Sequence, residues 1–251
     1  MSENHKNILV VLDAAGCAPG SIHMATELAA WMQASIQALY VEDNNILNVV
    51  DLPFTREVSL NTAKVEGIDS SRLIRKFQEE AKSLKKQINE IAVTRQVSIS
   101  FSSKRGHKMH VIKDSTQEVE VVLMPAVTQR RSRQQQHAQM NKVIVVFDKI
   151  DASCDKALNV ALSYATNKGN QLVVIVNDDQ SKQYVEKSIS QQAELVECEV
   201  VDIFDMDKVF MLFYRYSPGL FVLPQSSRLI EDEQLLQRLV NLTESDVLIV
   251  R

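Results

Sequence analysis

The chain has 251 residues, of which 45% are hydrophobic and 24% charged, and its formal net charge is −4. This composition excludes a wholly disordered protein and leaves enough length for a buried core. The acidic balance gives none of the broad positive surface of nucleic-acid-binding proteins. No apolar stretch approaches the roughly 18 residues of a membrane span.

The cysteines and the N-terminal segment both indicate the cytoplasm. Cys17, Cys154 and Cys198 are an odd and sparse set that does not make a disulfide framework. Segment 1–6 is polar and lacks the basic start, apolar core and cleavage site of a secretory signal. We therefore expect a cytoplasmic protein with no membrane partner.

The first predicted element is a buried strand, and its pattern occurs twice. Asn7–Asp13 is a run of branched apolar residues that ends in an acid, and Asn141–Asp148 repeats it. Continuous apolar runs of this length are typical of strands buried on both faces, as in a parallel sheet.

Each of these strands is followed by the same two elements. The helical pattern of His23–Trp31 leads to the strand Ile36–Asp43, and that of Lys156–Tyr164 leads to the strand Leu172–Asp178. Apolar residues three and four apart, with many alanines, are typical of a helix packed closely on a sheet. A strand–helix–strand unit that occurs twice is an internal repeat.

The second half continues the alternation to its end. The predicted helices are Ser181–Ala193, Asp207–Tyr216 and Leu229–Leu242, and the predicted strands are Leu195–Asp202, Gly219–Pro224 and Asp246–Arg251. Five strands alternating with four helices predict a doubly wound parallel sheet.

The first half departs from this pattern in two places. An insertion, 44–69, precedes its long helix, Ser71–Ala92, and no helix and strand follow the strand Val119–Pro125. Polar and basic residues come instead, and we interpret them as a linker. The predicted organisation is an incomplete domain over 1–126, a linker over 127–140 and a complete domain over 141–251.

These features resemble tandem universal stress proteins of bacteria. The resemblance rests on the strands that end in Asp13 and Asp148, on Tyr40-Val-Glu-Asp43, on Leu52-Pro-Phe-Thr-Arg-Glu-Val58 and on Ser245-Asp-Val-Leu-Ile-Val-Arg251. It implies an α/β protein of two doubly wound parallel-sheet domains, similar to the adenine nucleotide alpha hydrolase-like proteins. The first of the two domains lacks its last helix and strand. It also implies Asp13, Val41, Asp148 and Val176 as the residues beside adenine and ribose, if a nucleotide binds.

The phosphate end of that implied site is missing. Nucleotide-binding members carry a glycine loop after the fourth strand, because backbone N–H groups must approach the phosphates closely. Here the fourth strands end at Pro125 and Pro224, with no glycine between Gly106 and Gly169 and none after Gly219. We therefore expect that the protein has no cofactor. The alternative is that it binds ATP or another adenine nucleotide.

Other candidate sites are weaker. His107 and His110 can share a helix face, but no further metal ligands are placed near them by the sequence. Cys17 and Cys154 follow strands near helix starts, and neither belongs to a Cys-x-x-Cys motif. The basic stretch 130–133 lacks interleaved aromatic residues, and we expect a solvated linker rather than a nucleic-acid contact.

Two functions follow from these patterns. The first is a non-enzymatic, stress-associated protein that acts by association with another protein or with itself, without catalytic or metal-binding residues. The alternative is a protein that binds an adenine nucleotide or another small ligand at the carboxyl ends of the strands, with slow ATP hydrolysis.

The last strand predicts an assembly. Its four central residues are apolar, and an unpaired apolar edge is a template for another strand. We expect a homodimer in which two copies of this strand pair antiparallel through Asp246, Val247, Leu248, Ile249, Val250 and Arg251. The alternative is that the edge is covered within the chain, by the strand Val119–Met124 or by the linker.

Overall fold

The computed structural model describes most of the chain. The described residues are 6–14, 17, 19–50, 52, 55–58, 65–115, 119–126, 142–189, 196–243 and 245–251. The predicted linker, 127–140, lies outside them, as do Pro53 and Phe54 of the insertion.

Nine strands of the described residues form one continuous sheet. The first half supplies β1 (Asn7–Asp13), β2 (Ser35–Asp43), β5 (Ile99–Gly106) and β6 (Val121–Met124). The second half supplies β7 (Lys142–Phe147), β8 (Gln171–Val176), β9 (Val196–Val200), β10 (Leu220–Pro224) and β11 (Asp246–Val250). Their order across the sheet is β5-β2-β1-β6-β11-β10-β7-β8-β9.

The two halves follow the same internal order. When the strands of the first half that belong to this sheet are numbered along the chain, they lie across it in the order third, second, first, fourth (β5-β2-β1-β6). The strands of the second half have the same order (β9-β8-β7-β10), and their fifth strand, β11, lies beside the fourth. Within the nine-stranded sheet, all strand pairs inside each half are parallel. The described part of the first half supplies four strands to this sheet, and the second half supplies five.

The sheet corrects the prediction of two separate parallel-sheet domains. Strand β11 pairs in parallel with β10 on one side and antiparallel with β6 on the other, with Leu248 opposite Leu123. Both strands are buried along their whole length. An apolar strand at the rim of each half would expose unpaired backbone groups, and pairing β6 with β11 satisfies both edges.

The same pairing removes the reason for the predicted homodimer interface. Both edges of β11 have partners inside the chain, so Asp246, Val247, Leu248, Ile249, Val250 and Arg251 offer no free strand to a second copy. The intrachain alternative, pairing with the fourth strand of the first half, is the arrangement that forms.

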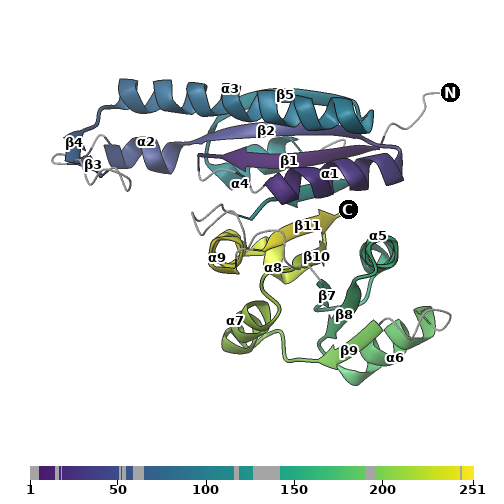
Figure 1. The fold of residues 1–251 in the computed structure, drawn as a ribbon. Coiled ribbons are helices and arrows are strands. Elements are labelled where there is room, and N and C mark those ends of the chain that lie inside the picture. The colour runs from purple at the N-terminus through teal and green to yellow at the C-terminus, as the bar shows by residue number, and fades with distance from the viewer. Residues whose placement is uncertain are drawn as a thin grey trace.

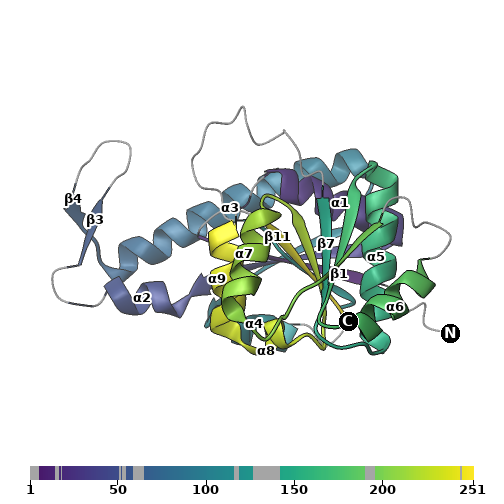
Figure 2. The same cartoon turned by 90° about the horizontal axis from the view of Figure 1, so that it is seen from below.

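Helices cover both faces of the sheet (Figures 1 and 2). Successive residues of β1 alternate between two core clusters, because successive side chains of a strand point to opposite faces. One cluster is covered by α1 (Pro19–Met32), α3 (Ser70–Arg95), α5 (Ala152–Lys168) and α6 (Asp179–Ser188). The other is covered by α4 (Lys108–Ser115), α7 (Met206–Arg215), α8 (Arg228–Glu231) and α9 (Glu233–Thr243).

The insertion forms a projection. Helix α2 (Asn44–Val50) continues beyond the end of β2, and the short strands β3 (Arg56–Val58) and β4 (Val65–Gly67) pair antiparallel. In Figure 2 these strands stand out from the body of the molecule, next to the start of α3. Among the described helices, none is both long and apolar enough to cross a membrane.

Candidate functional site

The predicted adenine-site residues of the first half lie side by side. Asp13 is the last residue of β1, and its register partner in β2 is Val41, which is buried. Both stand at the carboxyl end of the sheet, next to the point where the chain passes from one side of β1 to the other. Ligands of open α/β sheets bind at such points.

An ion pair occupies the Asp13 carboxylate. Lys108, the first residue of α4, places its Nζ 2.5 Å from Asp13 Oδ2, and both side chains are largely buried. Gly106 permits the tight entry into α4, because a Cβ there would lie 2.8 Å from the Val111 side chain. The acid that the family resemblance places beside adenine therefore already has a cationic partner.

The second half brings its predicted residues together in the same way. Val176 of β8 is buried and pairs with Phe147, and Asp148 follows directly. The backbone N–H of Arg228 donates to Asp148 Oδ2 at 2.6 Å, while Asp148 Oδ1 is buried and has no hydrogen-bond partner.

Hydrogen bonds close the loops around Asp148. Asp151 caps α5, accepting from the N–H and Oγ of Ser153, and these bonds hold the pKa of the Asp151 carboxyl down at about 2. Ser153 Oγ lies 2.7 Å from Ser226 Oγ. This contact joins the first turn of α5 to the loop after β10, where a phosphate would need open backbone.

In the first half, a third acid lies between the start of α1 and the residue that follows β6. Asp246, the first residue of β11, is 0% exposed. Its Oδ1 accepts a hydrogen bond from Ser21 Oγ at 2.6 Å and one from the Ala126 N–H at 2.7 Å, and its Oδ2 has no partner. Burial raises the pKa of this carboxyl to about 6, although the two hydrogen bonds oppose the rise.

The cysteines near these acids are not activated. Burial raises the pKa of the Cys17 thiol, and the nearby Asp246 charge adds to the rise. Burial likewise raises the pKa of Cys154 to about 11. A thiol with a raised pKa stays protonated and is a poor nucleophile.

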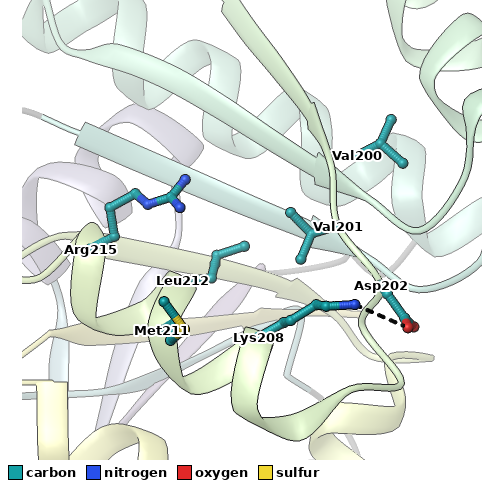
Figure 3. Close-up of a pocket in the computed structure, with 7 residues that line it drawn as sticks. All are labelled: Val200, Val201, Asp202, Lys208, Met211, Leu212 and Arg215. Atoms are coloured by element: carbon teal, nitrogen blue, oxygen red, sulfur yellow. Dashed lines mark ion pairs between the residues drawn. The ribbon is translucent and has the colours of Figure 1, made fainter.

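The described residues also line two cavities, the first of which borders the Asp13–Lys108 pair. One of about 360 Å³ is at the carboxyl end of β2, lined by Asp43, Asn45, His107, Lys108, Met109, His110, Gln234 and Gln237. The other, of about 310 Å³, lies between the end of β9 and α7 (Figure 3).

The rings of His107 and His110 contact edge to face, as their spacing suggested. No metal-binding group of three His, Cys, Asp or Glu occurs in the described part of the chain.

The comparisons with known proteins bear on the fold. No protein-family model and no curated protein matches this sequence. A universal stress protein from Archaeoglobus fulgidus DSM 4304 superimposes with a TM-score of 0.52 at 11% identity, over 97% of this chain and 96% of that one.

The chain has a universal stress protein-like α/β fold.

Two further solved structures align less well. A member of the universal stress protein family from Burkholderia pseudomallei gives a TM-score of 0.29 at 16% identity, over 80% of this chain and 100% of that one. A universal stress protein from Lactobacillus plantarum gives 0.34 at 19% identity, over 70% and 99%. At these identities the likeness extends to the fold alone.

Sequence reasoning missed the residues that close the universal stress protein-like crevices. Lys108 lies 95 residues from Asp13 in the chain, and Ser21 lies 225 residues from Asp246. Asp246 carried the one available signal, an acid placed directly before four apolar strand residues. An acid in that position is usually an exposed turn residue, so its burial follows only from the pairing of β11 with β6.

Proposed function

We propose that this chain is a non-enzymatic universal stress protein-like protein of two similar halves, and that it acts by associating with a second copy of itself rather than through a bound nucleotide. The observation that carries the proposal is that both carboxyl-end crevices are closed by partners from the chain. Asp13 is held by Lys108, Asp148 by the Arg228 N–H, and Asp246 fills the space between Ser21 and Ala126.

Electrostatics also disfavour a nucleotide in either crevice. The phosphates of ATP are strongly negative and need several backbone N–H donors at close range. In the first half, the Ala126 N–H already donates to a carboxylate. In the second, the Arg228 N–H is engaged and the buried Asp148 Oδ1 would face the incoming charge.

The outer face of α7 is the surface that we assign to self-association. Met211 is 67% exposed and Tyr214 80%, and the exposed Phe204 lies just before the helix. The face adjoins the cavity at the end of β9, in which Met211 and Arg215 are lining residues (Figure 3). Met211 lines this cavity, and exposed apolar residues close together on one helix and its entry are typical of an interaction surface.

Charge complementarity favours a second copy as the occupant. Helix α7 has Asp207 in its first turn and Arg215 in its last. When two α7 helices pack antiparallel about a two-fold axis near Met211, the acid of each lies beside the Arg of the other. The apolar pair Met211 and Tyr214 is then buried at the centre.

Light scattering coupled to size exclusion tests this assembly. We expect a dimer for the wild-type chain, and a monomer for Met211→Glu and for Tyr214→Glu, because each buries a charge in the apolar centre. Val93→Glu is the matched control, since Val93 is 80% exposed on α3, away from α7, and this variant should stay dimeric. A monomeric wild type, or dimers that survive both α7 substitutions, would overturn the assignment.

Calorimetry with Mg·ATP, ADP and adenosine tests the closed crevices. We expect no saturable heat at micromolar protein and millimolar ligand. The second candidate function, binding of an adenine nucleotide or another small ligand, is favoured by the cavity of about 360 Å³ beside the Asp13–Lys108 pair. Micromolar binding that is weakened by Gln237→Ala, a change in the lining of that cavity, would establish the second candidate instead.

A further inference from the structure

At the junction of the two halves, a buried acid, Asp246, accepts hydrogen bonds from two donors. Antiparallel pairing of β6 and β11 places the start of β11 at the carboxyl end of β6. Ala126, just beyond β6, and Ser21, in the first turns of α1, both donate to Asp246 Oδ1. The donors belong to the first half of the chain and the acceptor to the second.

The donors have the character of an anion site. The N-terminus of a helix carries partial positive charge, and α1 has no acidic residue in its first turn to balance it. A free backbone N–H at the end of a neighbouring strand, together with a hydroxyl on that helix, is the arrangement by which α/β proteins hold oxyanions. Here both groups converge on one carboxylate oxygen.

The burial of Asp246 is the second, independent observation. Its side chain is 0% exposed, and Oδ2 is left without a hydrogen bond, which is costly for a carboxylate. The side chains of Cys17, from the loop after β1, and Tyr164, from α5, are also close enough to interact with it. Within the described ranges no cation pairs with Asp246, and there the helix end and the two donors hold the charge.

We propose that Ser21, the Ala126 N–H and the N-terminus of α1 form an oxyanion site of the first half, and that the Asp246 carboxylate from the second half is its resident ligand. The site takes a singly charged oxyanion of carboxylate size, and it is filled from within the chain. The contact latches the start of β11 to the first half. This inference does not depend on self-association through α7.

Chemical rescue of Asp246→Ala tests the inference. Removal of the carboxylate leaves the donors unpaired in a small void, which external formate or acetate can enter. We expect the melting temperature of this variant to fall by several degrees, and sodium formate to restore at least half of the loss along a saturable curve. Sodium chloride at the same ionic strength should not.

The controls separate a refilled site from a general salt effect. Val247→Ala removes buried apolar atoms from the next residue of the same strand and leaves the carboxylate in place. Neither this variant nor the wild type should respond to formate more than to chloride. An Asp246→Ala variant that responds equally to both salts would overturn the proposal.

A second pair of variants applies if Asp246→Ala does not fold. Ser21→Ala should lower the melting temperature in the wild-type background more than in the Asp246→Asn background, because a hydroxyl bonds a carboxylate more strongly than an amide oxygen. An equal loss in both backgrounds would show a neutral packing role and would overturn the anion site.

Discussion

Three acids, at the carboxyl ends of β1 and β7 and at the start of β11, show how differently single charges are accommodated in this protein. Asp13 has a cation, Lys108, at 2.5 Å. In the part of the chain that the structure describes, Asp148 and Asp246 accept hydrogen bonds from neutral donors, and each keeps one buried oxygen without a hydrogen bond. A buried charge without a counter-ion is costly, so the fully buried Asp246 carries an electrostatic penalty.

The penalty at Asp246 predicts a pH dependence of stability. The pKa of its carboxyl is about 6 in the folded chain, against an ordinary value of 3.8. The folded state therefore binds this proton more tightly than the unfolded state does. The free energy of unfolding falls as the pH rises from about 4 to about 6, by about 3 kcal/mol from this group, and the loss is complete above that range.

Asp246→Asn isolates this contribution, since the amide does not ionise in this range. Urea unfolding of both chains from about pH 4 to pH 7.5 gives the difference in their unfolding free energies at each pH. We expect the wild type to lose about 3 kcal/mol relative to the variant across the range. A difference that stays constant with pH would contradict the raised pKa.

Elements with strong apolar patterns were predicted well from the sequence. The predicted strand Asn7–Asp13 has the bounds of β1, and the predicted strand at Gly219–Pro224 differs from β10 by one residue. Buried parallel strands are continuous apolar runs, so each contains its own signal. The repeated strand–helix–strand unit was readable for the same reason.

Three strands with weak or short apolar patterns were not predicted. Strand β5 lies at the edge and alternates weakly, with serines and exposed residues along most of its length, and β3 and β4 have only three residues each. The sequence predicts the pairing of β6 with β11 only as an alternative to a homodimer, because backbone pairing of apolar edges is nearly independent of side-chain identity. The candidate site depends on that pairing, and so Asp246 could not be placed.

The turn that leads into β10 depends on a glycine. A Cβ on Gly219 would lie 2.7 Å from the Tyr216 carbonyl oxygen and 2.8 Å from Ile144 Cδ1. The Gly219 carbonyl also accepts the N–H of Asp246, and its N–H donates to Ser245 Oγ, so the backbone cannot shift without disturbing the start of β11.

Gly219→Ala should therefore lower the free energy of unfolding by about 1–3 kcal/mol, as over-packing of a fixed backbone does. Gly20→Ala is the matched control, because nothing lies within 4 Å of its Cβ position. In helix α1 that change should be neutral or stabilising by up to about 1 kcal/mol. Chemical denaturation of both variants measures the two effects, and equal stabilities would contradict the close approach at Gly219.

For the whole molecule, the continuous sheet implies one folding unit. Strand β11 lies between β6 of the first half and β10 of the second, and its side chains contribute to both core clusters. Unfolding either half alone would expose an apolar strand edge and the side chains packed over it. Separate unfolding of the two halves is therefore disfavoured, even though their strand orders are alike.

Leu248→Ala tests this cooperativity at the centre of the junction. Leu248 is buried, opposite Leu123 of the first half and Val222 of the second. Its truncation should cost about 2–5 kcal/mol, as buried Leu→Ala changes do.

Two probes report on the two halves separately. Fluorescence of Trp31, the single tryptophan, follows the first half, and hydrogen exchange of β7 and β8 follows the second. We expect both probes to shift to the same lower denaturant midpoint, because loss of β11 packing unfolds both halves together. Two separate midpoints, with only the second half shifted, would mean that the halves fold independently despite their shared sheet.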